Sequence, residues 1–116
     1  MIYHITGAAD WERARAAGEY LLSTRGKSLA DEGFIHASTA QQVAQVANAF
    51  YLDADGLVVL VIDADRVRPP IRYEQVPDSA DPFPHIYGPL NADAVVRVVP
   101  LGKDASGRYT FAPDEA

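Results

Sequence analysis

Histidine is the residue type in this chain with the widest chemical range, and there are three of them: His4, His36 and His85. An imidazole titrates near neutral pH, donates and accepts hydrogen bonds, and binds metal ions. Three such side chains that meet in one cleft would form a candidate active or binding site. If each is instead buried and hydrogen-bonded by itself, the histidines are structural. The sequence leaves both interpretations open.

His85 lies in the segment FPHIYGPL, where Pro84 and Pro89 enclose it together with Tyr87. Proline fixes φ at about −65° and restricts the residue before it. A mobile loop has no need of this stiffening, so the segment predicts that His85 and Tyr87 are held rigidly in place.

Several other chemistries are disfavoured. The chain has no cysteine, which excludes thiolate nucleophiles and cysteine-ligated zinc or iron–sulfur sites. Three histidines are a ligand set of catalytic zinc sites, but no His-x-x-x-His spacing occurs, and we therefore predict no metal. There is no G-x-S-x-G elbow for a serine nucleophile, no G-x-x-x-x-G-K-[ST] phosphate loop and no G-x-G-x-x-G fingerprint.

The composition indicates one folded domain over residues 1–116, with 48% hydrophobic and 22% charged residues. Acidic residues outnumber basic ones and give a formal net charge of −6. Broad nucleic-acid binding needs a basic surface, so we expect none. The longest apolar run, LVVLVI, is too short to span a bilayer, and the first residues lack the regions of a signal peptide. With the absence of cysteine, this predicts a cytoplasmic protein that does not enter a membrane.

Two segments predicted as strands carry four of the candidate residues. IYHIT is β-branched and aromatic, and strand alternation places His4 and Thr6 on one of its faces. In GFIHAST the same alternation places His36 and Ser38 together, with Phe34 on their face. If the two strands are adjacent, these polar pairs lie side by side.

Two main helices are expected, and both fall in the first half of the chain. Asp10 before an alanine-rich run that closes at Gly18 predicts an N-cap and a C-terminal glycine. Ser28 with Asp31 three residues later predicts one further helical turn that starts with a capping box.

The second main helix is expected after Ser38 or Thr39, either of which could cap it. Apolar residues with the spacing of one buried helical face are Val43, Val46, Ala47 and Phe50.

Strands dominate the second half. LVVLVID is apolar on both faces and predicts a central strand, followed by a shorter strand at IRYE and another at residues 95–101. Residues 75–91 are rich in proline and predict a long irregular connection of functional interest. Early helices and late strands predict the α+β class, with a mainly antiparallel or mixed sheet.

The motifs IYHIT, GFIHAST, QVANAFY, LVVLVID, RYE and FPHIYGPL occur in this order over nearly the whole chain. On these motifs the chain resembles a bacterial family of small single-domain proteins catalogued as domain of unknown function nine hundred and fifty-two. The fold of that family is similar to the ADP-ribosyltransferase superfamily, which implies NAD as a substrate.

The resemblance also implies roles for single residues. IYHIT is similar to the L-W-H-G-T pattern that holds the nicotinamide ribose, which implies that His4 and Thr6 bind ligand. GFIHAST resembles the strand, serine and helix of the second motif, which implies a contact from His36 and Ser38.

The catalytic glutamate of the transferases has no counterpart in FPHIYGPL, which offers His85 and Tyr87 instead. Glu74 is the nearest substitute, ahead of Asp63 and Asp81, and we expect it to orient one histidine.

Two functions are therefore carried forward. The first is an enzyme, with His36, His85 and Glu74 as catalytic residues, that transfers ADP-ribosyl or a nucleotide 2′-phosphate and binds NAD, ADP-ribose or a related nucleotide. The second is a non-catalytic module that binds a small metabolite or a protein segment in the same cleft. The sequence does not set the oligomeric state.

Overall fold

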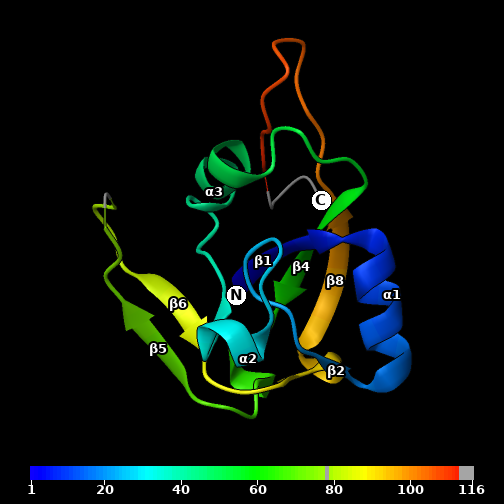
Figure 1. The fold of residues 1–116 in the computed structure, drawn as a ribbon, viewed down its shortest axis with the longest axis vertical. Coiled ribbons are helices and arrows are strands. Elements are labelled where there is room, and N and C mark those ends of the chain that lie inside the picture. The colour runs from blue at the N-terminus through cyan, green and yellow to red at the C-terminus, as the bar shows by residue number, and fades with distance from the viewer. Residues whose placement is uncertain (78, 113–116) are drawn as a thin grey trace.

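A central antiparallel sheet organises the structure, a computed structural model that describes residues 1–77 and 79–112. Its strands are β1 (Ile2–Gly7), β4 (Leu57–Ile62) and β8 (Val95–Pro100), in the order β1-β4-β8 (Figure 1). Every residue of β4 is buried, as expected of a strand with apolar side chains on both faces. The predicted central strand is therefore confirmed.

Two smaller antiparallel sheets adjoin the central one. The first has the order β3-β6-β5, with β3 (Ile35–His36), β6 (Phe83–Ile86) and β5 (Ile71–Glu74). Strands β5 and β6 extend as an arm beside the body of the molecule (Figure 1). The second sheet pairs β2 (Glu19–Tyr20) with β7 (Leu90–Asn91).

The chain after β3 is joined to β1 by a pair of backbone hydrogen bonds. Tyr3 N–H donates to Ser38 O over 2.8 Å, and Ser38 N–H donates to Tyr3 O over 2.7 Å. The segments IYHIT and GFIHAST are therefore neighbours.

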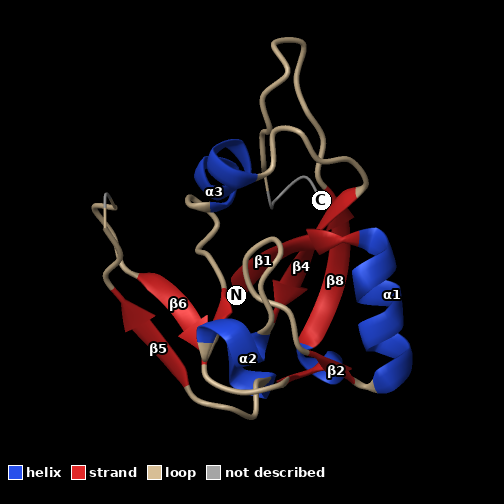
Figure 2. Cartoon of the chain, in the orientation of Figure 1, coloured by secondary structure: helices blue, strands red, loops and turns tan. Residues whose placement is uncertain are grey.

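Three helices lie around the strands in the described part of the chain (Figure 2). Helix α1 (Ala8–Ala17) ends at Gly18, whose φ of 86° favours glycine, and α3 (Val43–Phe50) is the second main helix. Helix α2 (Leu29–Glu32) is the single turn expected from the capping box of Ser28 and Asp31, which forms. Short 3-10 turns occur at Ala64–Arg66 and Ala92–Ala94.

Two hydrophobic clusters cover the two faces of the central sheet. Because successive side chains of β1 and β4 point to opposite faces, both strands contribute residues to both clusters. Ile2 and Leu60 point into the first cluster, together with Trp11 of α1. Tyr3 and Val59 point into the second, beneath α3. The α+β class with antiparallel pairing is therefore confirmed.

The predicted starts of the two main helices were wrong. Helix α1 begins before Asp10, which lies in its first turn, and Gly7 is the N-cap. Helix α3 begins only at Val43, because Ser38 pairs with Tyr3 and Gln42 Oε1 accepts from the N–H of Thr39 over 2.9 Å.

Two further expectations were wrong. Phe50 is 56% exposed, because it lies at the last residue of α3, beyond the cluster that buries the rest of the stripe. The segment expected as irregular contains β6, the middle strand of its sheet, and β7.

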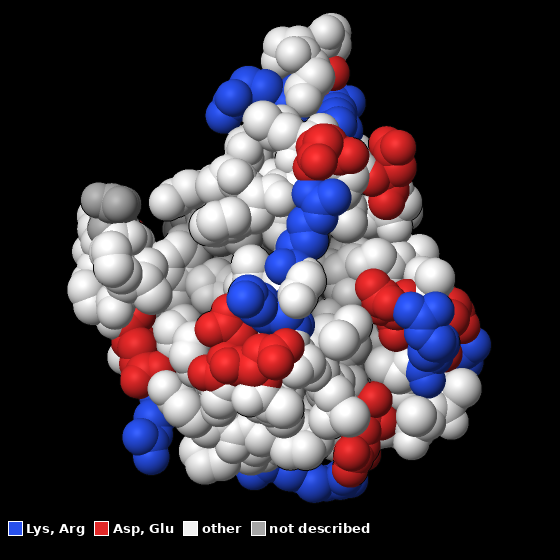
Figure 3. All heavy atoms as spheres, viewed as in Figure 1, with Lys and Arg blue, Asp and Glu red and all other residues white. Residues whose placement is uncertain are grey.

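No helix in the described residues is long and apolar enough to cross a membrane. On the face in Figure 3, Lys and Arg are interspersed with Asp and Glu.

Candidate functional site

His4 lies at the inner end of a chain of contacts that joins all three histidines. Its Nδ1 donates to the backbone carbonyl of His36 over 2.5 Å, and its Nε2 accepts from the hydroxyl of Tyr20 over 2.8 Å. A carbonyl can only accept, so the imidazole hydrogen is on Nδ1. Burial lowers the pKa of His4 to about 4, against the opposing effect of the bond to His36. His4 is therefore neutral at neutral pH, and the protein satisfies both its ring nitrogens.

His36 and His85 face each other across β3 and β6, where they form a cross-strand pair. Nδ1 of His36 lies 3.3 Å from Nε2 of His85. The His85 ring stacks on Phe34 with centroids 4.0 Å apart and planes at 16°, and the His36 ring packs on Phe83 with centroids 4.8 Å apart. These aromatic contacts fix the orientation of both rings.

Glu74, the last residue of β5, is hydrogen-bonded to the other side of His85. Its Oε1 accepts from Nδ1 of His85 over 2.8 Å and also from the hydroxyl of Tyr87. The guanidinium of Arg72 lies over the Tyr87 ring, 5.0 Å from its centroid. The bonds from Tyr87 and then His85 keep the pKa of Glu74 below its ordinary value, and the bond to Glu74 raises the pKa of Tyr87. At neutral pH the carboxylate is ionised and the phenol is protonated.

These partners determine which atom donates and which accepts at each step of the hydrogen-bonded chain from Glu74 to His36. The carboxylate of Glu74 accepts, so His85 carries a hydrogen on Nδ1 and, when neutral, accepts at Nε2 from Nδ1–H of His36. Nε2 of His36 then carries a lone pair. Burial, followed by the nearby His4 and His85, lowers the pKa of His36 to about 4. The hydrogen-bonded chain thus ends at the unprotonated Nε2 of His36, which can act as a base or as a hydrogen-bond acceptor.

His36 lines a pocket of about 420 Å³, which we call the His36 pocket. It lies between the side of α3, the chain that follows β5, and β6, near the notch beside the β5–β6 arm in Figure 3. Its lining consists of Thr24, His36, Gln45, Val46, Ala49, Phe50, Val76, Pro77, Ser79 and Phe83. This volume lies within the range of small-molecule sites, about 300–1,000 Å³.

Most of the predicted site residues lie together. A continuous run of contacts joins His4, His36, His85, Glu74 and Tyr87. Ser38 is buried and pairs with Tyr3 through its backbone, and Thr6 lines a different cavity.

Three neighbours of the histidines were not predicted as site residues. Tyr20 bonds His4, Phe34 stacks on His85, and the Oγ of Ser23 accepts from the N–H of His36 over 3.0 Å. Strand alternation already placed Phe34 on the face of His36, but no pattern in the sequence brings Tyr20 or Ser23 to the histidines. Within residues 1–77 and 79–112, no group of three or more His, Cys, Asp or Glu could hold a metal ion.

The fold and the site define a small α+β protein in which a histidine–glutamate cluster adjoins a pocket of small-molecule size. The chain belongs to the family described as "Protein of unknown function (DUF952)", which matches residues 5–98.

Similar solved structures are those of CC0527, a protein of Caulobacter crescentus. Its crystal structure has a TM-score of 0.80 and 29% sequence identity, covering 94% of this chain and 92% of that chain, and a crystal structure of a double mutant gives the same values. Its solution NMR structure has a TM-score of 0.74 and 30% identity, covering 92% of this chain and 89% of that chain. No curated protein matches the chain.

Proposed function

We propose that this protein is an enzyme in which His36 acts as a general base on a nucleotide-like substrate bound in the His36 pocket. The observation that carries the proposal is the hydrogen-bonded chain from Glu74 through His85 to His36, which ends at the pocket. A catalytic base must be unprotonated and oriented at the operating pH, and it is most efficient when its pKa lies near that pH. The pKa of about 4 keeps His36 unprotonated but makes it a weaker base than an ordinary imidazole. The support for a base role is therefore its orientation by the hydrogen-bonded chain.

The substrate class is NAD, ADP-ribose or a related nucleotide. Val46, Phe50 and Phe83 give the pocket apolar and aromatic walls, which suit a flat heterocyclic ring. We also propose that the protein is related to the ADP-ribosyltransferase superfamily, as the sequence motifs imply. In ADP-ribosyl transfer, an acceptor oxygen bonds to the anomeric carbon of the ribose while the bond to nicotinamide breaks. Nε2 of His36 receives the proton of the acceptor.

The other members of the chain act through His36. His85 accepts the hydrogen bond of His36 Nδ1, so it stabilises the imidazolium that forms when Nε2 takes a proton. Glu74 fixes the tautomer of His85 and offsets the developing positive charge. Tyr87 orients Glu74, and His4 holds the backbone of His36, so both are positioning residues.

Turnover and binding of NAD and ADP-ribose by the His36→Asn variant test the proposal. Asparagine retains a donor near the position of Nδ1, so it can still bond His85, but it has no base at the position of Nε2. We expect nicotinamide release from NAD to fall by about a hundredfold or more, while the dissociation constant changes only a few-fold. Gln45→Ala, which alters the same pocket outside the chain, is the control. Equal turnover by His36→Asn and the wild type would refute a base role.

A second candidate is a non-catalytic binding module on the same pocket. One observation favours it: Glu74 is bonded to His85 and Tyr87, and no carboxylate is found among the described residues that line the pocket. On this alternative the wild type binds NAD or ADP-ribose without turnover, and His36→Asn weakens binding.

A further inference from the structure

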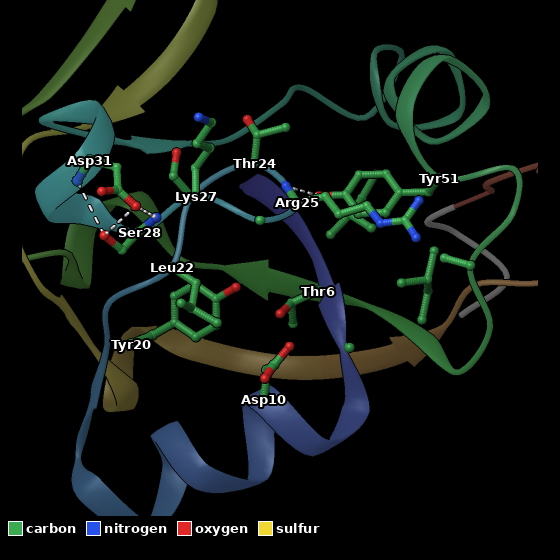
Figure 4. A pocket seen from close by; sticks show the side chains of 16 residues that line it. Thr6, Asp10, Tyr20, Leu22, Thr24, Arg25, Lys27, Ser28, Asp31 and Tyr51 are labelled. Atoms are coloured by element: carbon green, nitrogen blue, oxygen red, sulfur yellow. Dashed lines mark hydrogen bonds between the residues drawn. The ribbon is translucent and has the colours of Figure 1, made fainter.

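A second cavity of about 420 Å³ lies on the other side of Thr24, which lines both pockets. Its roof is the hairpin of residues 22–28, and its floor comes from the end of β1, the first turn of α1, and β2 (Figure 4). We call it the hairpin cavity. None of the residues in the chain from Glu74 to His36 lines it, and it adjoins the His36 pocket at Thr24.

The hairpin that forms the roof is well ordered by hydrogen bonds. Ser23 N–H donates to Lys27 O over 2.9 Å, and Lys27 N–H donates to Thr24 O over 2.8 Å. Arg25 N–H donates to the hydroxyl of Tyr51 over 2.9 Å. The cavity is therefore bounded by a fixed element rather than by a loose loop.

Polar groups converge on the floor. In Figure 4 the carboxylate of Asp10 and the hydroxyls of Thr6 and Tyr20 point toward the same space. Oδ1 of Asp10 is bonded to Arg13, but Oδ2 has no partner among the described residues. Gly7 leaves room for that oxygen, since a Cβ at Gly7 would lie 3.2 Å from it.

Two buried hydroxyls in the lining have hydrogens to donate. The Tyr51 hydroxyl accepts from Arg25 N–H, and the Ser23 hydroxyl accepts from His36 N–H. Within the described residues neither hydroxyl donates to an acceptor. The cavity thus offers both hydrogen-bond donors and a carboxylate acceptor to a ligand.

The lining carries two acids, Asp10 and Asp31, and two bases, Arg25 and Lys27, so its formal charges balance. Asp10 pairs with Arg13, and Arg25 pairs with Asp53. Asp31 accepts from the N–H and hydroxyl of Ser28, each over 3.0 Å, at the start of α2. A cation or an anion would find little unbalanced charge here. A neutral ligand with many hydroxyl groups suits these donors, this carboxylate and the tyrosine rings better.

We propose that the hairpin cavity binds a sugar, with Oδ2 of Asp10 accepting hydrogen bonds from vicinal hydroxyls and with Ser23 and Tyr51 donating. This inference does not depend on the proposed function, because Asp10, Ser23 and Tyr51 have no role in the proposed reaction. The two sites are nevertheless neighbours, since the Ser23 hydroxyl accepts from His36 N–H and Thr24 lines both pockets.

The test is NMR titration with D-ribose, 2-deoxy-D-ribose, D-glucose and D-galactose, with spermidine as a charged comparison. We expect at least one sugar to shift the Thr6 methyl and Gly7 amide signals while leaving Val46 and Phe83 unchanged. Loss of a hydrogen bond to a carboxylate raises a dissociation constant by about tenfold or more. Asp10→Asn should therefore weaken sugar binding by that factor. The Gly7→Ala change, which crowds Oδ2, should weaken binding as well.

Two controls separate this result from other effects. Glu12→Gln changes another acid of α1 that does not line the cavity, and His36→Asn removes the proposed base. Both should bind the sugar as the wild type does. The proposal is overturned if none of the four sugars shifts Thr6 and Gly7, if Asp10→Asn binds as tightly as the wild type, or if spermidine alone binds.

Discussion

His4 and His36 are held uncharged by their surroundings, and this should make the folding stability depend on pH. The pKa of each falls from an ordinary 6.5 to about 4 in the folded protein. Above pH 6.5 these two histidines are neutral in both the folded and the unfolded protein, so they do not lower the free energy of unfolding. Between 6.5 and about 4 the unfolded chain binds protons that the folded protein does not, so stability falls as the pH falls. For the buried His4 alone the loss is on the order of 3 kcal/mol.

Urea unfolding at a series of pH values measures this loss. A His4→Gln variant lacks one of the two titrating groups, so its free energy of unfolding should vary less steeply over the same interval. A free energy that stays constant from neutral pH to about pH 4 would show that these histidines are not held neutral by the fold.

Gly88, in the FPHIYGPL segment, is expected to tolerate no side chain. Its φ is 156°, and a Cβ there would lie 2.7 Å from Cβ of Pro69. Strain of this kind costs roughly 1–3 kcal/mol, and we expect Gly88→Ala to lower the unfolding free energy by at least that amount. Gly102→Ala is the matched control, because a Cβ at Gly102 would have no neighbour within 4 Å among the described residues. Equal stability of the two variants would contradict the packing described.

The residue types of the site were predictable from the sequence, but their partners were only partly so. Strand alternation gives the face of His36, yet it gives no register between β3 and β6, and the contact of His36 with His85 depends on that register. The bond from Tyr20 to His4 depends on the path of the chain between α1 and β3, which no local pattern specifies.

At the scale of elements, α3 combines a structural face with a wall of the His36 pocket. Val46 is 6% exposed and belongs to the second hydrophobic cluster, whereas Phe50 is 56% exposed. We expect Val46→Ala to destabilise the protein by about 1–3 kcal/mol and Phe50→Ser to change stability by about 0.5 kcal/mol or less. Chemical denaturation of the two variants makes the comparison. A larger effect at Phe50 would mean that Phe50, and not Val46, is the residue of α3 that packs against the cluster.

Strand β6 shows why the FPHIYGPL segment was predicted as a loop. Proline lacks an N–H and is rarely found in the middle of a sheet. Here β3 ends at His36, and Pro84 lies opposite Ala37, whose N–H donates to Pro84 O over 3.0 Å. The missing donor of Pro84 therefore falls where the ladder has already ended. The proline stops the pairing of β3 with β6 just past His85, instead of preventing it.

At the scale of the whole molecule, the two hydrophobic clusters should not unfold separately. Adjacent residues of β4 point into different clusters: Val59 into the one under α3, and Leu60 into the one under α1. Because one strand supplies both, losing either cluster disrupts the other. We expect a single calorimetric transition whose van't Hoff and calorimetric enthalpies agree.

Substitutions on the two sides of β4 check this coupling. Val59→Ala and Leu60→Ala should each lower the midpoint of the same transition, with a cost of about 2 kcal/mol or more for Leu60. Two resolved transitions, or a variant that shifts only part of the signal, would indicate independent folding units.

The overall class was predictable because it rests on strong periodic signals such as the apolar run of β4 and the stripe of α3. The arrangement of the sheets was less predictable. Strands β2, β3 and β7 have two residues each, which is too short for a recognisable sequence pattern. They are stabilised by long-range pairing, and it is this pairing that brings the histidines together.

Nitrogen-15 NMR of the three imidazoles across a pH titration tests the protonation of His36 and His85 directly. The chain from Glu74 to His36 predicts that His36 carries its hydrogen on Nδ1, has an unprotonated Nε2 and stays neutral down to about pH 4. It also predicts that His85 carries a hydrogen on Nδ1. If the His36 ring carries its hydrogen on Nε2, or titrates near its ordinary pKa of 6.5, then His36 does not present an unprotonated Nε2 as a base.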